Sequence, residues 1–163
     1  MSNPKILELV DIFANLKPEQ LERIIKICEP LSYKSNEVIF EEGSLSNDFY
    51  IILEGKIEIQ IDQEARRDGS KPPPRVRIAV LFRGQSFGEV ALVDQGLRSA
   101  SAVCGSQSCT LLRIRRRDFM DLLQSDKEMG FTVMTNLAAD LCTKIRNTNY
   151  LAREALLYGL KPA

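Results

Sequence analysis

The sequence contains no histidine among its 163 residues. It therefore lacks the commonest general base of enzymes and a frequent zinc ligand. The four cysteines, Cys28, Cys104, Cys109 and Cys142, are scattered and form no C-x-x-C pair. Such spacing favours buried free thiols over a metal site. We therefore expect neither an enzyme nor a bound metal or cofactor.

An excess of charge and long apolar runs are also missing. The 22 lysines and arginines balance the 22 aspartates and glutamates, so the basic surplus of a general nucleic-acid binder is absent. No apolar run approaches the ~20 residues that a membrane helix needs. Met1–Lys5 has no signal-peptide layout. These features predict one cytoplasmic domain away from the membrane, large enough to bury roughly 70% of its unfolded surface.

Glycine is absent from the beginning of the chain and abundant in its centre. The first is Gly43, seven lie between residues 43 and 105, and only Gly130 and Gly159 follow. A turn-poor start and end indicate helices, and a turn-rich centre indicates short strands.

Two helices are predicted before residue 31. Asn3 and Pro4 suit the N-cap and first position of the first helix, Pro18 opens the second, and Pro30 stops it. Their apolar stripes recur at helical spacing: Ile6, Leu9, Val10 and Phe13, then Leu21, Ile24, Ile25 and Cys28.

The centre predicts a half-buried antiparallel sheet, because apolar and polar residues alternate along its segments. The strands expected are Leu31–Tyr33, Glu37–Phe40, Phe49–Glu54, Lys56–Ile61, Arg75–Phe82, Ser99–Cys104 and Cys109–Ile114. The fold class is α+β, mainly β: an antiparallel jelly-roll barrel with N-terminal helices and a C-terminal helical pair that includes a long helix. All three parts belong to one domain: the barrel occupies residues 31–115, the N-terminal helices residues 1–30 and the C-terminal helices residues 116–163.

Two polar segments carry alternatives. Asp62–Pro74 holds three prolines and cannot be a continuous strand, so it is either a tolerated loop insertion, which is favoured, or a docking site for a partner. Arg113–Arg117 is rich in arginine, but Asp118 and Asp121 follow, which favours a solvated surface over a nucleic-acid site.

The last third predicts a short helix over Arg116–Gln124 and a long one from about Lys127 to Leu157, capped by Ser125 or Asp126. A helix of ~30 residues spans ~45 Å, more than a small barrel needs. Its surplus length favours a homodimer through this helix, and the alternative is a helix that packs on its own barrel alone. The apolar seam contains Met134, Leu137, Leu141, Ile145, Thr148, Leu151 and Ala155.

The residues with the clearest chemistry lie between positions 87 and 100. Gly88 allows close approach of backbone to a ligand, and amide groups at the start of a short helix would face an anion. Arg98 offers a guanidinium fork for two phosphate oxygens. Glu89, an acceptor when ionised, suits ribose hydroxyls. Together they fit a singly charged phosphodiester joined to a sugar.

This segment, Phe87-Gly88-Glu89-Val90-Ala91-Leu92 followed by Arg98-Ser99-Ala100, resembles the phosphate-binding cassette of the cyclic-nucleotide-binding domain family. Phe40–Gly43 and Phe49–Gly55 resemble the family's early hairpins, in the expected order. The resemblance implies that Arg98 and backbone amides of Ala91 and Ala100 bind the cyclic phosphate, and that Glu89 binds the ribose 2′-hydroxyl. The alternative is a simple ion pair between Glu89 and Arg98.

A weaker resemblance to the bacterial catabolite-activator branch covers Leu137–Asn149. It implies that Thr148 and Asn149 lie near the purine, with the opposite subunit as one source. Transcription factors of that branch carry a helix-turn-helix, and six residues after Leu157 cannot hold one, so we expect no direct DNA binding.

The function predicted is binding of a cyclic mononucleotide, cyclic AMP before cyclic GMP, by a ligand-responsive regulatory module; one alternative is a dimeric regulator that acts through an effector protein. Ser99 permits cyclic GMP, since the resemblance implies that a hydroxyl there reaches the guanine amino group or the phosphate; the alternative is a serine bonded to its own backbone. The rival functions are a phosphodiesterase and an interaction module that keeps the fold without a ligand.

Overall fold

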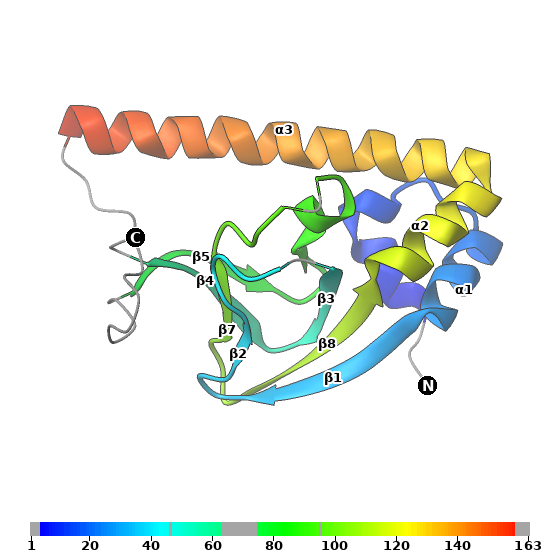
Figure 1. The fold of residues 1–163 in the computed structure, drawn as a ribbon, viewed down its shortest axis with the longest axis horizontal. Coiled ribbons are helices and arrows are strands. Elements are labelled where there is room, and N and C mark those ends of the chain that lie inside the picture. Colours follow the sequence, from blue (N-terminus) through cyan, green and yellow to red (C-terminus); the bar gives the residue numbers. More distant parts are fainter. Residues whose placement is uncertain (1–3, 46, 63–74, 95, 159–163) are drawn as a thin grey trace.

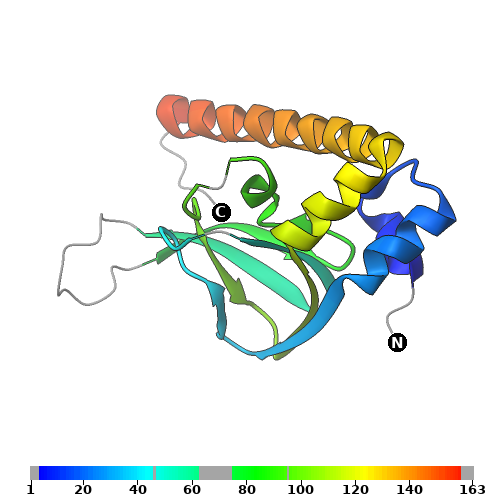
Figure 2. The ribbon, with the colours of Figure 1, turned by 45° about the vertical axis from the view of Figure 1, so that its right-hand side comes forward.

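Two four-stranded antiparallel sheets form the body of the molecule, and helices cover one end and one side (Figures 1 and 2). The computed structural model describes residues 4–45, 47–62, 75–94 and 96–158. The mainly β jelly-roll barrel predicted from the sequence is confirmed. Residues 63–74, most of the polar Asp62–Pro74 segment, lie outside the described residues.

The first sheet has the order β1-β8-β3-β6 and the second β2-β7-β4-β5. Their bounds are β1 Cys28–Lys34, β2 Val38–Phe40, β3 Asp48–Glu54, β4 Lys56–Asp62, β5 Arg75–Phe82, β6 Ser86–Phe87, β7 Ser101–Cys104 and β8 Ser108–Arg115. The two-residue β6 was not predicted, because two residues are too few to show alternation. Ser99 precedes β7 rather than starting it.

Two apolar clusters stabilise the fold. One lies between the N-terminal segment, the first sheet and the C-terminal helices, where the rings of Phe13, Phe49 and Phe119 contact one another edge-on or tilted. The other fills the barrel and includes Tyr50 and Phe87. Both clusters border the segment that follows β6, so the candidate site rests on packed walls.

The N-terminal segment differs from the predicted α-helix. It forms two 3-10 helices, η1 Pro4–Leu9 and η2 Asp11–Phe13, separated by an extended Val10. Leu7, Val10 and Phe13 are buried at three-residue intervals, the period of a 3-10 helix, while Leu9 is exposed. The predicted stripe was therefore wrong at Leu9, and Asn3 lies outside the described residues.

Pro30 does not stop a helix. The second helix, α1, spans Pro18–Lys26, and β1 begins at Cys28, so Pro30 lies within a strand. Because β1 is the edge strand of its sheet, a residue without an N–H is tolerated there.

The four thiols are free, as predicted, but they are not all buried. Cys104 and Cys109 are buried, Cys28 is half-buried and Cys142 is exposed on the last helix. In the arginine-rich segment, Arg113 and Arg115 both form ion pairs with Glu29.

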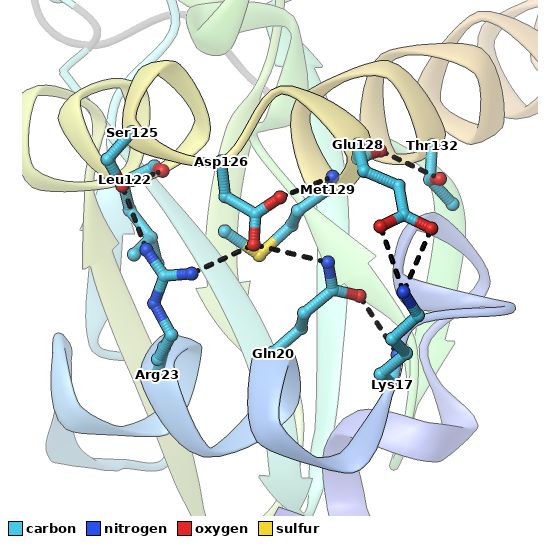
Figure 3. A network of polar contacts seen from close by, with 9 residues as sticks. All are labelled: Lys17, Gln20, Arg23, Leu122, Ser125, Asp126, Glu128, Met129 and Thr132. Atoms are coloured by element: carbon cyan, nitrogen blue, oxygen red, sulfur yellow. Dashed lines mark hydrogen bonds and ion pairs between the residues drawn. The ribbon is translucent and has the colours of Figure 1, made fainter.

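A polar network joins α1 to the junction of the two C-terminal helices, α2 Arg116–Ser125 and α3 Lys127–Tyr158 (Figure 3). Asp126 caps α3: its Oδ1 accepts the Met129 N–H at 3.0 Å. Its Oδ2 accepts from Arg23 at 2.8 Å and from Gln20 at 3.3 Å. Of the two predicted caps, Asp126 is the one that forms, because Ser125 instead donates its hydroxyl hydrogen to the Leu122 carbonyl.

The long helix α3 has two environments. Its first half packs on the domain, where Leu137 is buried and Met134 and Leu141 are half-buried against the core. From Cys142 to Leu157 every side chain except that of Glu154 is exposed. The predicted seam is therefore divided, since its first three residues cover the chain's own core. Within the described ranges, no helix is both long and apolar enough to cross a membrane.

The capping contact predicts a pH-dependent contribution to stability. The pKa of Asp126 is lowered, first by the Met129 N–H and then by Gln20. A lowered carboxyl pKa stabilises the native state above the unfolded pKa, near 4, and this contribution disappears as pH falls through the folded value. Asp126→Ala should lower the thermal midpoint at pH 7, and the difference from wild type should shrink below about pH 4.

The control is Asp121→Ala, an exposed aspartate of α2. It should leave the midpoint nearly unchanged across the same pH range. A difference for Asp126→Ala that stays constant down to pH 2 would contradict the role of the ionised cap.

Candidate ligand-binding site

The centre of the site is a tight turn after β6. Gly88 has φ +77°, in the left-handed region, and is followed by the 3-10 helix η3, Glu89–Leu92. A Cβ on Gly88 would lie 2.5 Å from Nη1 of Arg98, so only glycine allows the arginine so close. The helix expected after Gly88 is thus a single 3-10 turn.

Arg98 lies inside the wall of the barrel, with 7% of its surface exposed. Its Nη2 donates to the Asp48 carbonyl at 2.6 Å and its Nη1 to the Gly88 carbonyl at 3.2 Å. The guanidinium carbon lies 3.9 Å from the centre of the Phe40 ring, a cation–π contact. Burial lowers the pKa of Arg98, which nevertheless stays charged at neutral pH.

The backbone of Arg98 is held as firmly as its side chain. Its N–H donates to the Ser44 carbonyl at 2.9 Å, and its carbonyl accepts the Gly43 N–H at 2.8 Å. The Phe40–Gly43 segment, singled out from the sequence as an early hairpin, therefore positions the arginine through both its ring and its backbone. Behind it, Phe40, Tyr50 and Phe87 pack with ring centres between 5.3 and 5.9 Å apart.

Glu89 is equally buried but does not pair with Arg98. Its Oε1 accepts from Nζ of Lys144, on α3, at 2.5 Å. Lys144 also lies 2.8 Å from Oδ2 of Asp140, one turn earlier on α3. Glu89 and Arg98 therefore have different partners, and the alternative of a simple ion pair between them is wrong.

Two buried polar atoms in this site have no hydrogen-bond partner: Oε2 of Glu89 and Nε of Arg98. A buried polar atom without a partner costs free energy, and more so when it is charged. One is an acceptor and the other a donor, so the turn offers one place for a hydroxyl and one for an anion. No group of three or more carboxylates or thiols that could hold a metal occurs within the described part of the chain.

The other predicted site residues follow the same turn. Leu92 is buried and Val90 is exposed, so η3 is anchored on one side and open on the other. Ala91 lies in η3. Ser99 is exposed and Ala100 half-buried, directly after Arg98.

Thr148 and Asn149 are exposed on α3. The Thr148 hydroxyl donates to the Lys144 carbonyl at 3.0 Å and is exposed. Since it follows Lys144 by one turn, it shares the side of α3 that faces Glu89. Asn149 is exposed and lies about 140° further around the helix than Lys144.

Sequence reasoning missed the partners of the two key residues. Lys144 is 55 residues from Glu89, and Asp48 is 50 residues from Arg98. Asp48 acts through its carbonyl, which any residue provides, so no sequence signal exists. For Lys144 a signal existed, because it stands one turn before Thr148, which the resemblance to the catabolite-activator branch implies to lie near the purine.

Comparisons of the sequence with family models and with known proteins agree on one family. The family model described as "Cyclic nucleotide-binding domain" matches residues 30–126. The cyclic AMP receptor protein of Thermus thermophilus is 28% identical over 138 residues, which cover 85% of this chain and 58% of that protein. A cGMP-dependent protein kinase of Drosophila melanogaster (isozyme 2 forms cD5/T2) is 30% identical over 124 residues, 76% of this chain and 13% of the kinase. The chain thus spans little more than half of one relative and a small part of the other.

The fold agrees with this match. The crystal structure of the Thermus thermophilus catabolite activator protein superposes with a TM-score of 0.72 at 28% identity, covering 88% of this chain and 62% of that one. Because the family model covers more than half of the sequence and includes the turn with Gly88, Glu89 and Arg98, the chain belongs to the cyclic nucleotide-binding domain family.

Proposed function

We propose that this protein is a regulatory module that binds a cyclic mononucleotide, cyclic AMP in preference to cyclic GMP, without catalysing a reaction on it. Arg98 holds the cyclic phosphate together with backbone amides at Ala91 and Ala100, and Glu89 accepts from the ribose 2′-hydroxyl.

The observation that carries this proposal is the pair of buried, unpartnered atoms on one turn. Nε of Arg98 offers a donor on a charged fork, and Oε2 of Glu89 offers an acceptor. A phosphodiester fused to a ribose supplies both an anion and a hydroxyl in one molecule, which neither a simple anion nor a free sugar does. The family model matches residues 30–126, which include this turn, and the two relatives named above carry cyclic AMP and cGMP in their names.

The first prediction concerns the arginine. Replacing Arg98 with alanine removes a charge-assisted contact worth about 1.5–3 kcal/mol, so binding of cyclic AMP should weaken roughly ten- to a hundredfold. Arg98→Lys keeps the charge but loses the fork and should fall between the two. Isothermal titration measures the affinities, and the thermal midpoint of each variant establishes that it folds.

The matched control is Arg83→Ala, because Arg83 is an exposed arginine outside the turn. It should bind as wild type does. Wild-type protein should also gain about 2.7 kcal/mol of stability when the ligand is present at 100 times its dissociation constant. If no cyclic or linear nucleotide raises the midpoint, the protein is an interaction module without a ligand; conversion of cyclic AMP to linear nucleotide would instead make it a phosphodiesterase.

The choice of base depends on Ser99, which is exposed beside Arg98. If its hydroxyl contacts the guanine amino group, Ser99→Ala removes one neutral hydrogen bond. The affinity for cyclic GMP should then fall about two- to tenfold. Cyclic AMP should change by less than about twofold. Competition between the two nucleotides, measured on wild-type protein and on Ser99→Ala, tests this. If the two proteins have the same relative affinity for the two nucleotides, Ser99 does not contact the base, and the alternative of a serine bonded to its own backbone holds.

We further propose that α3 pairs with α3 of a second copy, through a face that differs from the predicted seam. Along α3, eight exposed and uncharged residues recur at alternating intervals of four and three, the spacing of a coiled-coil seam. This outward stripe lies opposite Val133 and Leu137, which pack on the domain. It consists of Phe131, Thr135, Ala138, Cys142, Ile145, Asn149, Ala152 and Leu156.

Charge favours a second copy in parallel orientation. Arg146 and Arg153 flank the outward stripe on one side, and the other flank, which includes Thr148 and Ala155, is uncharged. In a parallel pair each arginine flank faces an uncharged flank, whereas an antiparallel pair would bring arginines together. Asn149 then lies at the centre of the seam, where a single asparagine sets the register. In this dimer Asn149 faces the partner, whereas Thr148 stays on the side of α3 that carries Lys144.

The dimer predicts a clear effect at Ile145, which is 60% exposed in the single chain. Ile145→Glu places a charge in the seam and should yield monomers by light scattering, with little change in the thermal midpoint of the domain. Oxidation should link Cys142 to its copy, because parallel pairing brings their Cα atoms within disulfide range of about 4.4–6.8 Å.

Thr143→Glu, an exposed threonine away from the outward stripe, is the control and should remain dimeric. Leu141 is unsuitable for this test, because it packs on the chain's own core. Wild-type protein that stays monomeric at high concentration, with and without cyclic AMP, would show that the outward stripe is not an interface between copies.

A further inference from the structure

Lys144 joins the outer half of α3 to the ligand site. Its Nζ lies 2.5 Å from Oε1 of Glu89 and 2.8 Å from Oδ2 of Asp140. The three side chains differ in exposure: 6% for Glu89, 19% for Asp140 and 44% for Lys144. A cation that is still in contact with solvent therefore bridges a buried carboxylate on the barrel and a second carboxylate on its own helix.

Lys144 is the partner of the buried carboxylate of Glu89. A buried charged group needs an opposite charge and hydrogen bonds to compensate its burial, and Lys144 supplies both. Burial by itself would lower the pKa of Lys144, but Glu89 and Asp140 outweigh burial and raise it, so Lys144 remains protonated. Oε1 of Glu89 is thus occupied, and Oε2 is left as an acceptor.

Lys144 is also a mechanical link. From Cys142 to Leu157 the side chains of α3 are exposed, apart from that of Glu154. The ion pair of Lys144 with Glu89 ties this half of the helix to the barrel. Figure 1 shows α3 passing over the segment between β6 and β7. A displacement of the Glu89 side chain therefore changes the position of α3 at Lys144.

We infer that Lys144 is a positioning residue of the ribose site: it holds Glu89 oriented toward the ribose hydroxyl, and through it the bound nucleotide fixes the outer half of α3 against the barrel. This inference rests on the proposed function and deepens it. Asp140 provides Lys144 with a second partner on its own helix, so that the link to Glu89 can open without leaving an isolated cation.

The test compares cyclic AMP with 2′-deoxy cyclic AMP, which lacks the hydroxyl that Glu89 accepts. Wild-type protein should prefer cyclic AMP by roughly tenfold. Lys144→Gln should lose most of that preference. Its affinity for cyclic AMP should fall, whereas its affinity for the deoxy nucleotide should change by less than about twofold. Lys144→Arg, which keeps the charge, should retain the preference.

The matched control is Arg117→Gln, which removes an exposed cation of α2, away from the site and from the outward stripe, and should alter neither affinity. Amide hydrogen exchange gives an independent readout. Cyclic AMP should slow exchange in residues 142–158 of wild-type protein and should leave them unchanged in Lys144→Gln.

The possible outcomes distinguish a failure of the inference from a failure of the proposed function. If wild-type protein binds and discriminates, and Lys144→Gln discriminates equally well, the inference fails while the proposed function stands. If Lys144→Gln weakens both nucleotides by the same factor, Lys144 acts as a general charge, and the positioning role is overturned. If wild-type protein binds neither nucleotide, both the proposed function and the inference fail.

Discussion

The burial of Arg98 constrains much of the surrounding structure. A guanidinium with 7% exposure must be compensated inside the barrel wall, and the Asp48 and Gly88 carbonyls and the Phe40 ring provide that compensation. Each comes from a different element: β2, the start of β3 and the turn after β6. The arrangement of these three elements is therefore fixed around one side chain. Position 88 is constrained as well, because the Cβ of any larger residue would collide with the guanidinium of Arg98.

The same burial explains why the site is suited to binding. Two of the guanidinium nitrogens are held by the protein, so the group is already oriented and loses little freedom when a ligand arrives. The atoms left without partners, Nε of Arg98 and Oε2 of Glu89, are those the protein does not use for its own stability. A site of this kind is destabilised locally and gains when its donors and acceptors are satisfied from outside.

Much of the barrel and of the turn could be predicted from the sequence, because their signals are local. Alternation along β4 and β5 and the spacing from Gly88 to Arg98 are properties of neighbouring residues. The failures arose where tertiary context decides. Pro30 stays within a strand only because β1 is an edge, and Leu9 is exposed because the first turns wind as 3-10 helices. Lys144 could not be paired with Glu89 from periodicity, since its partner lies 55 residues away on another element.

The seam on α3 shows the limit of periodicity most clearly. Met134, Leu137 and Leu141 share a stripe with Ile145, yet the structure places the first three against the core and leaves Ile145 exposed. One regular pattern on a helix can thus serve two surfaces, and only the neighbours reveal which. The outward stripe escaped notice because threonine, alanine and cysteine occupy positions where a zipper would have leucine. Because α3 is one continuous helix, the ion pair at Lys144 and the outward stripe are carried by a single stiff element. A shift of the helix at Lys144 would move the stripe as well, so the proposed ligand binding and the proposed pairing of copies would be linked through α3.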